Sequence, residues 1–376
     1  MSASASKLFR VAPEQVNATI GAALRTWFPG KSWSDVRSLL RGRHVTVSGN
    51  LCLDEGRRLK LDEVVKVLEH PAAAPPKEED VRIRYLDAHV VIVEKPAGMT
   101  TLRHPEERHW PKRRKQLQPT LDEILPRLVA KQDEKRRAGS QPGRGQKDSK
   151  GRPAKRPPEK LRGVPRRLRA VHRIDRETSG LMVFARTVEA ERILGAQFRA
   201  HSLSRVYVAV VPGNVQEQTI DSWLIDDRGD GRRGSTPHKK QGKHAVTHVK
   251  PLERLGNYTV VECRLETGRT HQIRIHLSEL GHPLCGDKVY RGPFPGKPIP
   301  DDSGAPRVAL HAAELGFEHP VTNELLHFAM PLPTDLAGLI DRLRRPRKRP
   351  EREVPKSKDR DDGEGRARPR RASKRE

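Results

Sequence analysis

The sequence predicts an α+β protein in which a small helix-and-strand module precedes a larger domain of strands and helices. The chain has 376 residues, which exceeds the roughly 250–300 residues at which a single hydrophobic core stops growing. Residues 71–80 begin with a run rich in Pro and Ala, which is typical of a linker. Apolar residues at strand and helix spacing occur on both sides of it. We therefore expect a flexible N-terminus at residues 1–15 and two folded regions, at residues 16–70 and 81–340.

The first folded region shows the pattern of a helix followed by two short strands. Ser32 and Asp35 match a capping box, which opens helices, and Gly42 is of the residue type that ends them. The alternating residues 44–48 and the apolar run at 63–68 are typical of strands. This order predicts a small α/β module.

The second folded region mixes strands with helices along the chain. Thr187 can cap a helix that carries Ala190, Leu194 and Phe198 on one face. Apolar spacing predicts another helix at residues 270–280. Alternating or continuous apolar runs predict strands at residues 82–85, 90–93, 182–185, 204–211 and 258–265. The larger domain is therefore expected to be α+β.

The basic excess of the chain is concentrated in two segments. The formal net charge is +26, and residues 103–169 hold 22 Lys and Arg against 8 Asp and Glu, a net charge of +14. Residues 344–376 hold 15 against 7, a net charge of +8. Both are poor in apolar residues, so they cannot bury enough surface to offset the entropy lost on ordering. We expect a basic, largely disordered insertion at 104–165, a basic disordered tail at 341–376, and a polyanionic partner.

Composition also argues against several classes of protein. Cys52, Cys263 and Cys285 are far apart and show no C-x-x-C spacing, which disfavours a disulfide framework and a zinc ribbon. His271 and His276 are five residues apart, on different sides of the predicted helix, which disfavours a metal site. No apolar run approaches the length of a membrane span, and the N-terminus lacks an apolar signal core. We expect a soluble cytoplasmic monomer without a membrane partner.

One carboxylate lies between two arginines in the segment from His172 to Leu181, which reads HRIDRETSGL. Arg173 and Arg176 flank Asp175, and nearby positive charge favours the ionised form of a carboxylate. Asp175 could then serve as a nucleophile or a base, and the arginines suit a polyanionic substrate. From spacing alone, a surface ion-pair cluster before a strand is the more common explanation.

Two later segments supply further candidate residues. Tyr207 lies in the predicted strand 204–211, with its ring on the face opposite its two valine neighbours, where a core aromatic would also fit. Arg274 lies on a different face of the predicted helix from Ile273 and Leu277, so its side chain can point into a cleft. A tyrosine and an arginine could thus share a site with a carboxylate.

Three ordered blocks resemble the RluA-type pseudouridine synthases. HRIDRETSGL matches the family's active-site pattern H-R-[LI]-D-x-x-T-S-G-[LI] at every fixed position, and ETGRTHQIRIHL at residues 266–277 is similar to TGRtHQIRvHl. VEKPAG at residues 93–98 resembles the family's vvNKPaG, with Glu94 where Asn is usual. The resemblance covers residues 81–335 and implies a mixed, mainly antiparallel sheet of the pseudouridine synthase type.

The resemblance also implies a role for each candidate residue. Asp175 would be the catalytic aspartate, acting at the anomeric carbon as a nucleophile or at the ribose 2′ carbon as a base, and the sequence leaves both routes open. Arg173 would fill the space left by a flipped nucleotide, and Tyr207 would stack on its uracil. Arg274 would pair with Asp175, and neither a metal nor an organic cofactor would be needed. Further candidates for RNA contact are Arg176 and Arg269.

The small module resembles the alpha-L RNA-binding module that is shared with a small-subunit ribosomal protein. In that family a basic helix face meets RNA phosphates, so the implied contacts are Arg37, Arg41 and Arg43. The family's usual GD turn before the last strand is replaced by Leu-Asp-Glu at residues 61–63. The module would therefore add RNA affinity to the larger domain.

Together the two resemblances predict an isomerase, an RNA pseudouridine synthase that acts on specific uridines, with large-subunit ribosomal RNA as its expected substrate. Three alternatives stay open at this point. The chain could act on transfer RNA, could be a non-catalytic RNA-binding factor in ribosome assembly, or could hydrolyse a glycosidic bond through Asp175. The last alternative usually needs a second carboxylate as an acid, and no motif supplies one.

Overall fold

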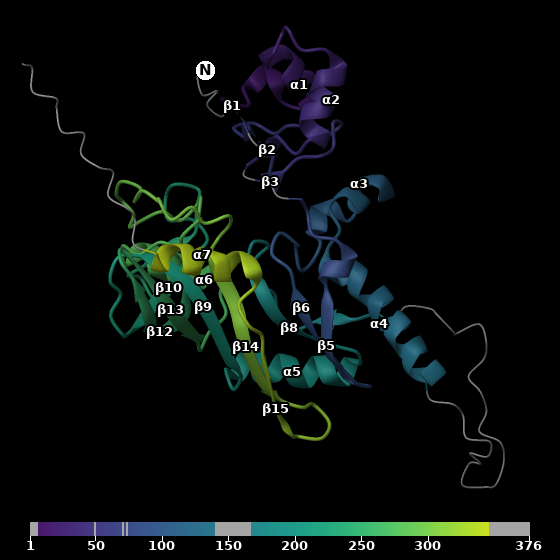
Figure 1. Ribbon diagram of the computed structural model, residues 1–376, viewed down its shortest axis with the longest axis vertical. Helices are drawn as coiled ribbons and strands as arrows, with labels where there is room; N and C mark the ends of the chain where they lie inside the picture. Colours follow the sequence, from purple (N-terminus) through teal and green to yellow (C-terminus); the bar gives the residue numbers. More distant parts are fainter. Residues whose placement is uncertain (1–6, 49, 70, 73, 140–166, 346–376) are drawn as a thin grey trace, which may run out of the picture. The chain divides into compact units, whose positions relative to one another are not determined.

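A computed structural model describes residues 7–48, 50–69, 71–72, 74–139 and 167–345 of the chain. These residues form a small N-terminal module and a larger domain, each built on its own β-sheet (Figure 1). Within the described ranges, no helix has the length and apolar character needed to cross a membrane. The three cysteines, Cys52, Cys263 and Cys285, are buried and free.

The N-terminal module packs two helices against a four-stranded antiparallel sheet. In spatial order its strands are β1 (Lys7–Arg10), β4 (Val64–Val67), β2 (Val45–Val47) and β3 (Asn50–Leu51). Its helices are α1 (Ile20–Trp27) and α2 (Trp33–Arg41). One buried cluster joins both helices to the sheet and includes Leu24, Val36, Val45 and Val65. The module therefore has a hydrophobic core of its own.

Ser32 and Asp35 cap α2 as the sequence predicts. The Ser32 hydroxyl accepts the N–H of Asp35 at 3.1 Å, and the Asp35 carboxylate accepts the N–H of Ser32 at 2.7 Å. Gly42 follows the last helical residue, and the two predicted strands are present as β2 and β4. The sequence did not predict α1, which Thr19 caps by accepting the N–H of Ala22 at 3.2 Å.

The expectation of a flexible N-terminus at residues 1–15 is wrong for the part that the structure describes. β1 pairs antiparallel with β4 at the edge of the module's sheet. Phe9 stacks on Trp27 with ring centroids 4.7 Å apart, and Val11 is buried. A strand this short shows little alternation by itself, and its partner strand lies far later in the chain. Residues 1–6 lie outside the described ranges.

The larger domain is built on an eleven-stranded sheet. Its main path runs β11 (Gly234–Thr236), β10 (Gln218–Ile225), β12 (Lys243–Leu255), β13 (Tyr258–Leu265), β9 (Ser204–Pro212), β14 (Leu310–Glu318), β8 (Ser179–Ala185), β6 (Val90–Lys95) and β5 (Arg82–Leu86). Two further strands, β15 (Leu325–Ala329) and β7 (Arg169–Ala170), pair with β14 and β8. Among the described strands only β14 and β8 pair in parallel. The sheet is therefore mixed and mainly antiparallel, which confirms the fold class implied by the resemblance.

Helices pack against both faces of this sheet (Figure 1). They are α4 (Leu121–Gly139), α5 (Val188–Ala200), α6 (Gln272–Glu279) and α7 (Thr334–Arg344), and the short helix α3 (Lys112–Leu117) precedes α4. Val91 and Val93 of β6 join a buried cluster with α4 and α6, whereas Val90 and Ile92 join another with α5. Because side chains alternate along a strand, β6 separates the face that carries α6 from the face that carries α5.

Several predicted elements of the larger domain are confirmed. β13 has the predicted bounds, and β5, β6, β8 and β9 include the other predicted strands. Thr187 caps α5 by accepting the N–H of Ala190 at 3.1 Å, and Ala190 and Leu194 are buried on that helix. α6 lies within the predicted range 270–280. Periodicity therefore locates the elements that surround the three motif blocks.

The expectation of a largely disordered insertion at residues 104–165 is wrong for the part that the structure describes. α3 and α4 lie in this segment, and α4 packs into the same cluster as α6. The buried side chains of α4 are Leu121, Ile124, Leu125 and Val129. Their spacing at three and four residues forms one apolar face, which is enough to hold a helix otherwise rich in charge. Residues 140–165 of the predicted insertion lie outside the described ranges.

The larger domain also extends beyond its predicted end at residue 340. α7 continues to Arg344, whose guanidinium pairs with Glu253 at 2.7 Å. Leu336 and Leu339 of this helix are buried in a cluster with β9 and β13. The first residues of the predicted tail therefore belong to the domain, while those from 346 onward lie outside the described ranges.

Candidate active site

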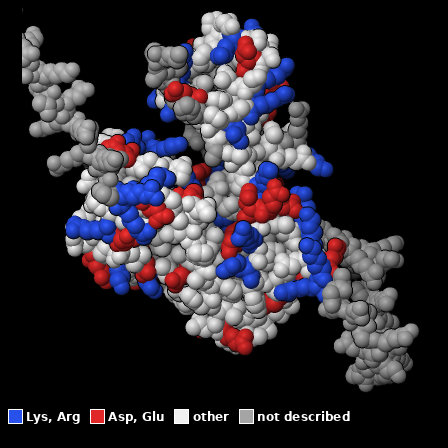
Figure 2. All heavy atoms as spheres, in the orientation of Figure 1, with Lys and Arg blue, Asp and Glu red and all other residues white. Residues whose placement is uncertain are grey.

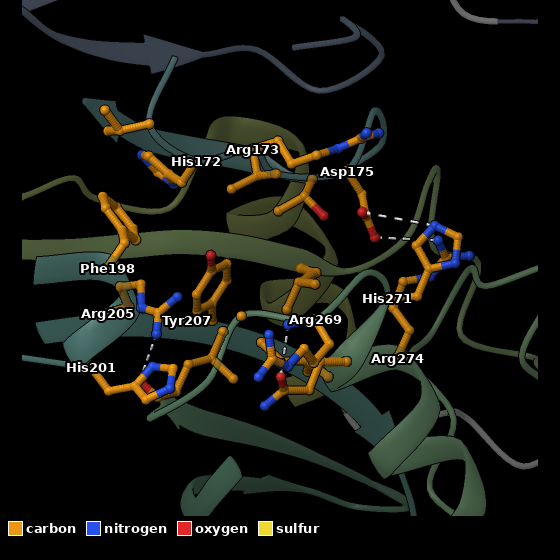
Figure 3. Close-up of a pocket in the computed structure, with 18 of the residues that line it drawn as sticks. His172, Arg173, Asp175, Phe198, His201, Arg205, Tyr207, Arg269, His271 and Arg274 are labelled. Atoms are coloured by element: carbon orange, nitrogen blue, oxygen red, sulfur yellow. Dashed lines mark hydrogen bonds and ion pairs between the residues drawn. The ribbon is translucent and has the colours of Figure 1, made fainter. Parts of the chain in front are cut away.

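A cavity of about 460 Å³ opens in the larger domain where the ends of several elements meet (Figure 3). Its walls come mainly from residues 171–178 before β8, from the end of α5 and the start of β9, and from residues 265–274 before and within α6. These stretches contain the HRIDRETSGL block, Tyr207 and the TGRTHQIR block. The fold therefore brings together residues that are far apart in the sequence.

Asp175 lies in this cavity with a side chain that is 20% exposed. Its Oδ2 is 3.4 Å from Nη1 of Arg274, and its Oδ1 is 3.8 Å from Nε2 of His271 (Figure 3). Asp175 and Arg274 thus lie together as the family resemblance implies. A guanidinium at this distance forms a charge-assisted contact with a carboxylate.

The backbone on either side of Asp175 is held by the loop that follows β6. The carbonyl oxygen of Arg176 accepts the N–H of Gly98 at 2.7 Å and a hydrogen bond from Nζ of Lys95 at 3.1 Å. The carbonyl oxygen of the residue before Asp175 accepts the hydroxyl of Thr101 at 2.9 Å. Lys95 is fully buried, and burial lowers the pKa of its ammonium to about 7. The KPAG segment therefore positions the loop of Asp175.

Arg274 is oriented by a second carboxylate, Asp287. Asp287 accepts hydrogen bonds from Nε of Arg274 at 2.7 Å and from its Nη2 at 3.0 Å. The ring of Tyr290 lies 5.0 Å from the guanidinium carbon. Burial opposes the charge of Arg274, but the hydrogen bonds to Asp287 outweigh it and raise the pKa of the guanidinium above its usual value. The sequence did not predict this role for Asp287, because only the fold brings its loop to α6.

His271 precedes α6 and joins the same network. Its Nδ1 is 2.8 Å from the hydroxyl of Tyr290, and its Nε2 faces Asp175. Burial lowers the pKa of the imidazole below its usual value, even though Asp175 acts in the opposite direction. A neutral imidazole beside Asp175 leaves Arg274 as the cation that pairs with the carboxylate.

Tyr207 contributes to the cavity wall from β9. Its side chain packs in the same buried cluster as α6, whereas Val208 contacts the cluster that contains α7. The predicted orientation of the ring, opposite its valine neighbours, is therefore confirmed. Burial raises the pKa of the phenol above its usual value, so the hydroxyl is protonated at neutral pH.

The remaining predicted arginines of the larger domain divide into two groups. Arg173 and Arg269 are exposed and line the cavity, and Nε of Arg269 donates to the carbonyl of His244 at 2.9 Å. Arg176 is not among the described residues of the cavity wall. Its Nε instead donates to the carbonyl of Gly98 at 3.0 Å. RNA contact by these three arginines stays a prediction.

The residues of the cavity wall that were not assigned to a site from the sequence include His172, Phe198 and Arg205. His172 stacks on Phe198 with ring centroids 4.6 Å apart, and its Nε2 accepts the N–H of Val183 at 3.0 Å. Burial lowers the pKa of His172 to about 3, so its imidazole is neutral at pH 7. Arg205 lies two residues before Tyr207, and this period-two spacing was the signal available in the sequence.

The candidate arginines of the module lie on α2 or directly after it. Arg37 is half-exposed and pairs with Glu55 at 2.9 Å. Arg41 is the last residue of α2 and is exposed, and Arg43 follows with a left-handed backbone at φ 64°. Contact of these residues with RNA stays a prediction.

Basic and acidic side chains are interspersed on the face of the folded regions that Figure 2 shows. The two basic segments at 103–169 and 344–376 carry +22 of the net charge of +26, which leaves about +4 for the rest. Non-specific electrostatic attraction to a polyanion therefore comes mostly from these two segments. The cavity adds a few arginines at defined positions.

Among the described residues, no group of three or more His, Cys, Asp or Glu could hold a metal ion. His271 and His276, the two histidines of the third block, have separate surroundings. Nε2 of His276 lies 2.9 Å from the Ser222 hydroxyl, and its Nδ1 lies 2.9 Å from the Thr247 hydroxyl. Both nitrogens of His276 are therefore engaged within the core.

Comparison with known proteins adds to this geometry. The model of the RNA pseudouridylate synthase family matches residues 89–279, a range that contains Asp175, Tyr207 and Arg274. The chain belongs to this family. The pseudouridine synthase is therefore an isomerase that converts uridine to pseudouridine within RNA, and the net reaction neither oxidises nor hydrolyses its substrate.

Relatives match this pseudouridine synthase over most of its length. It is 34% identical to the uncharacterized RNA pseudouridine synthase YlyB of Bacillus subtilis, over 88% of this chain and 95% of that protein. It is 32% identical to the ribosomal large subunit pseudouridine synthase D of Zymomonas mobilis, over 88% of this chain and 95% of that protein. The solved structure of Human RNA Pseudouridylate Synthase Domain Containing 4 aligns with a TM-score of 0.49 at 21% identity, over 70% of this chain and 92% of that chain.

Proposed function

We propose that this pseudouridine synthase modifies uridines in large-subunit ribosomal RNA. The relative from Zymomonas mobilis, 32% identical, carries that substrate in its name, as does a 32% identical relative from Pseudomonas aeruginosa. An N-terminal module that resembles a ribosomal RNA-binding module and a net charge of +26 support a large anionic substrate. Transfer RNA is the alternative substrate that the experiment below separates.

The pair of Asp175 and Arg274 in one cavity with Tyr207 carries the chemical part of the proposal. Asp175 acts at the ribose, either by attacking the anomeric carbon or by removing the proton at the 2′ carbon, and uracil is released. Arg274 pairs with the carboxylate and orients it. The ring of Tyr207 stacks on the uracil, which turns and rejoins the ribose through C5.

Arg173 replaces the flipped uridine in the RNA. Its exposed side chain lies at the cavity wall, two residues before Asp175. Extruding a base costs a few kcal/mol, so a cation that fills the gap and pairs with phosphates favours the extruded state. Further phosphate contacts come from Arg269 and from the module arginines Arg37, Arg41 and Arg43.

The composition of the cavity wall supports isomerisation over hydrolysis. Asp175 is the only acidic residue among the described residues that line the cavity. Glycosidases use a pair of carboxylates on the two sides of the bond that breaks. Asp287 does not meet that need, because its side chain is fully buried and both of its oxygens bind Arg274.

We also propose that the enzyme works as a monomer in the cytoplasm. The candidate residues Asp175, Tyr207 and Arg274 lie in one cavity within a single copy of the chain. A ribosomal RNA substrate would be met where ribosomes assemble. Light scattering of the purified chain, alone and with RNA, checks the stoichiometry, and a stable dimer would contradict the monomer.

The proposal is tested by incubating the full-length protein with large-subunit ribosomal RNA and with transfer RNA, then mapping pseudouridine in each. The expected result is pseudouridine at defined positions in the ribosomal RNA, which disappears in Asp175→Ala. Modification confined to transfer RNA would overturn the substrate. RNA binding without any modified uridine would contradict enzymatic activity and favour a non-catalytic RNA-binding factor. Release of free uracil would favour a hydrolase.

A further inference from the structure

Arg205 is a buried arginine that forms no ion pair with an acidic residue in the described part of the chain. Its side chain is 7% exposed, and Nη2 donates to the carbonyl oxygens of Glu266 at 2.7 Å and Leu265 at 3.5 Å. Its Nε is buried and has no hydrogen-bond partner among the described residues. Burial lowers the pKa of this guanidinium below its usual value, yet arginine stays charged in proteins. By contrast, the buried guanidinium of Arg274 is gripped by a carboxylate.

This unbalanced cation faces the cavity beside Tyr207. Residues two apart on a strand point to the same face, and both Arg205 and Tyr207 line the cavity from β9 (Figure 3). The ring of Phe198 lies 5.6 Å from the guanidinium carbon. A Cβ added at Gly268 would lie 2.5 Å from Nη1, so the glycine gives the guanidinium its room. The guanidinium is thus held between an aromatic ring and two carbonyl oxygens. Only its Nη2 donates to those oxygens, so other N–H groups of the guanidinium remain as donors.

A charged donor left unsatisfied in a buried site is costly, so it indicates a ligand that completes it. The reaction supplies such a ligand. When the bond between C1′ and N1 breaks, its electron pair stays with the uracil, whose negative charge spreads over the ring and its two carbonyl oxygens. Preorganised donors aimed at charge that develops during a reaction stabilise it strongly in a site that excludes water. Asp175 cannot stabilise this charge, because its own negative charge passes to the departing base when the carboxylate bonds to C1′ or takes the 2′ proton.

We propose that Arg205 is a further catalytic residue, whose guanidinium donates hydrogen bonds to a carbonyl oxygen of the detached uracil and stabilises its negative charge. This inference rests on the proposed function. As C1′–N1 breaks, Asp175 bonds to C1′ or takes the 2′ proton, and Arg205 balances the negative charge of the uracil while the base turns on Tyr207. C5 then bonds to C1′ as the carboxylate is released or returns its proton. Loss of the proton from C5 and gain of a proton at N1 complete pseudouridine, so atoms and charge balance. Stabilising the anion also keeps the base in the cavity while it turns.

Arg205 is buried, which distinguishes it from the exposed arginines that suit phosphate binding. Arg173 and Arg269 are exposed at the cavity, where a flexible RNA backbone can reach them. Arg205 instead lies in the wall, close to the ring against which the base would stack. Substitution at Arg205 should therefore change the rate of the chemical step more than it changes RNA affinity.

The test compares two RNAs, one with uridine and one with 5-fluorouridine at the position that the wild-type enzyme modifies. Fluorine withdraws electrons, so 5-fluorouracil leaves more readily and needs less stabilisation. Rates of loss of the N1-linked nucleoside are measured in single turnover at saturating enzyme. Arg205→Met should slow uridine about 100- to 1,000-fold, the effect of removing one donor to a developing anion, and should slow 5-fluorouridine by a clearly smaller factor. Arg205→Lys, which keeps the charge, should lie between Met and wild type for both RNAs.

Arg264→Met is the matched control, because Arg264 lies on the neighbouring strand β13 with a side chain that is 58% exposed and outside the cavity wall. Both of its rates should stay within about twofold of wild type. Equal slowing of both RNAs by Arg205→Met, or weaker binding with unchanged rates, would overturn the role of Arg205. If Arg205→Met does not fold, the comparison is made with Arg205→Lys. Equal slowing of the uridine and 5-fluorouridine RNAs by that variant would then overturn the role of Arg205. A wild-type enzyme without pseudouridine product in any RNA would instead overturn the proposed function.

Discussion

Asp287 holds Arg274 at shorter distances than Asp175 does. Nε and Nη2 of Arg274 lie 2.7 and 3.0 Å from the two oxygens of Asp287, whereas Nη1 lies 3.4 Å from Asp175. Asp287 also accepts the backbone N–H groups of Val289 and Tyr290 at 2.8 and 3.1 Å. The carboxylate of Asp287 therefore fixes the guanidinium, which leaves one donor directed at Asp175.

Asp287→Asn should impair both stability and catalysis, although Asp287 does not line the cavity. Breaking a buried pair leaves an unbalanced charge and costs about 3–5 kcal/mol of unfolding free energy. Misplacing Arg274 should lower kcat about 100-fold with a smaller effect on KM. Urea unfolding and steady-state kinetics below the unfolding midpoint measure the two effects. Asp341→Asn, at an exposed residue of α7, is the control, and equal kcat in the two variants would contradict the positioning role.

Tyr207 allows stacking and proton transfer to be separated. Tyr207→Phe keeps the ring, so RNA affinity should stay within about twofold, whereas Tyr207→Ala removes a stacking platform worth about 1–3 kcal/mol per base. If the hydroxyl assists proton removal from C5, Tyr207→Phe should lower kcat about 100-fold. Filter binding and single-turnover rates measure these effects. A Tyr207→Phe enzyme with the wild-type rate would confine the residue to stacking.

His172 should make stability fall as the solution becomes acidic. Its pKa is about 3 in the folded protein against 6.5 for an ordinary histidine, so the unfolded chain binds more protons between these values. Neutral His172 contributes fully to the free energy of unfolding above pH 6.5. This contribution falls by about 1 kcal/mol per pH unit as the pH falls from 6.5 toward 3.

His172→Phe isolates this contribution, because phenylalanine keeps a ring against Phe198 but cannot titrate. It leaves the N–H of Val183 without its acceptor, so at pH 7 the variant should be about 1–3 kcal/mol less stable than wild type. The difference in unfolding free energy between wild type and variant, measured by urea titration, should be smaller at pH 5 than at pH 7 and smaller again at pH 4. A gap that stays constant with pH would show that His172 is not buried as a neutral acceptor.

Removing residues 346–376 should weaken RNA binding without changing the chemical step. The segment holds 13 Lys and Arg against 7 Asp and Glu. A plot of log affinity against log salt concentration has a negative slope, and each phosphate contact that is lost makes that slope shallower by about 0.7–0.9. The cut leaves α7 intact, including the pair of Arg344 with Glu253. A Gly/Ser replacement of equal length separates charge from length. Affinity and salt slope equal to wild type would rule out the electrostatic role.

Local patterns were sufficient to predict the elements around the cavity. The N-cap residues of α2 and α5 and the alternation of β9 and β13 arise from residues close in the chain, so the sequence contains the signal. β12 was missed because Pro251 interrupts it and the pairing register shifts there. β1 was missed because its pairing depends on β4, far later in the chain.

The same distinction applies to the site. Asp175, Tyr207 and Arg274 belong to motif blocks and could be predicted together, including the pairing of Asp175 with Arg274. Asp287 could not, because its contact with α6 exists only after the 281–287 loop has folded back. Arg205 was visible as a neighbour of Tyr207 in strand spacing, but only the fold shows that its buried Nε has no partner among the described residues.

The most direct test of the account is the formation of pseudouridine by Asp175→Asn, a substitution that keeps the size of the side chain and removes its charge. Single-turnover reactions with ribosomal RNA, followed by pseudouridine mapping, compare the variant with wild type, and thermal unfolding confirms that both are folded. The account predicts defined pseudouridine sites for wild type and none for Asp175→Asn, with RNA binding retained. Pseudouridine formation by Asp175→Asn at the wild-type rate would contradict the central role of this carboxylate.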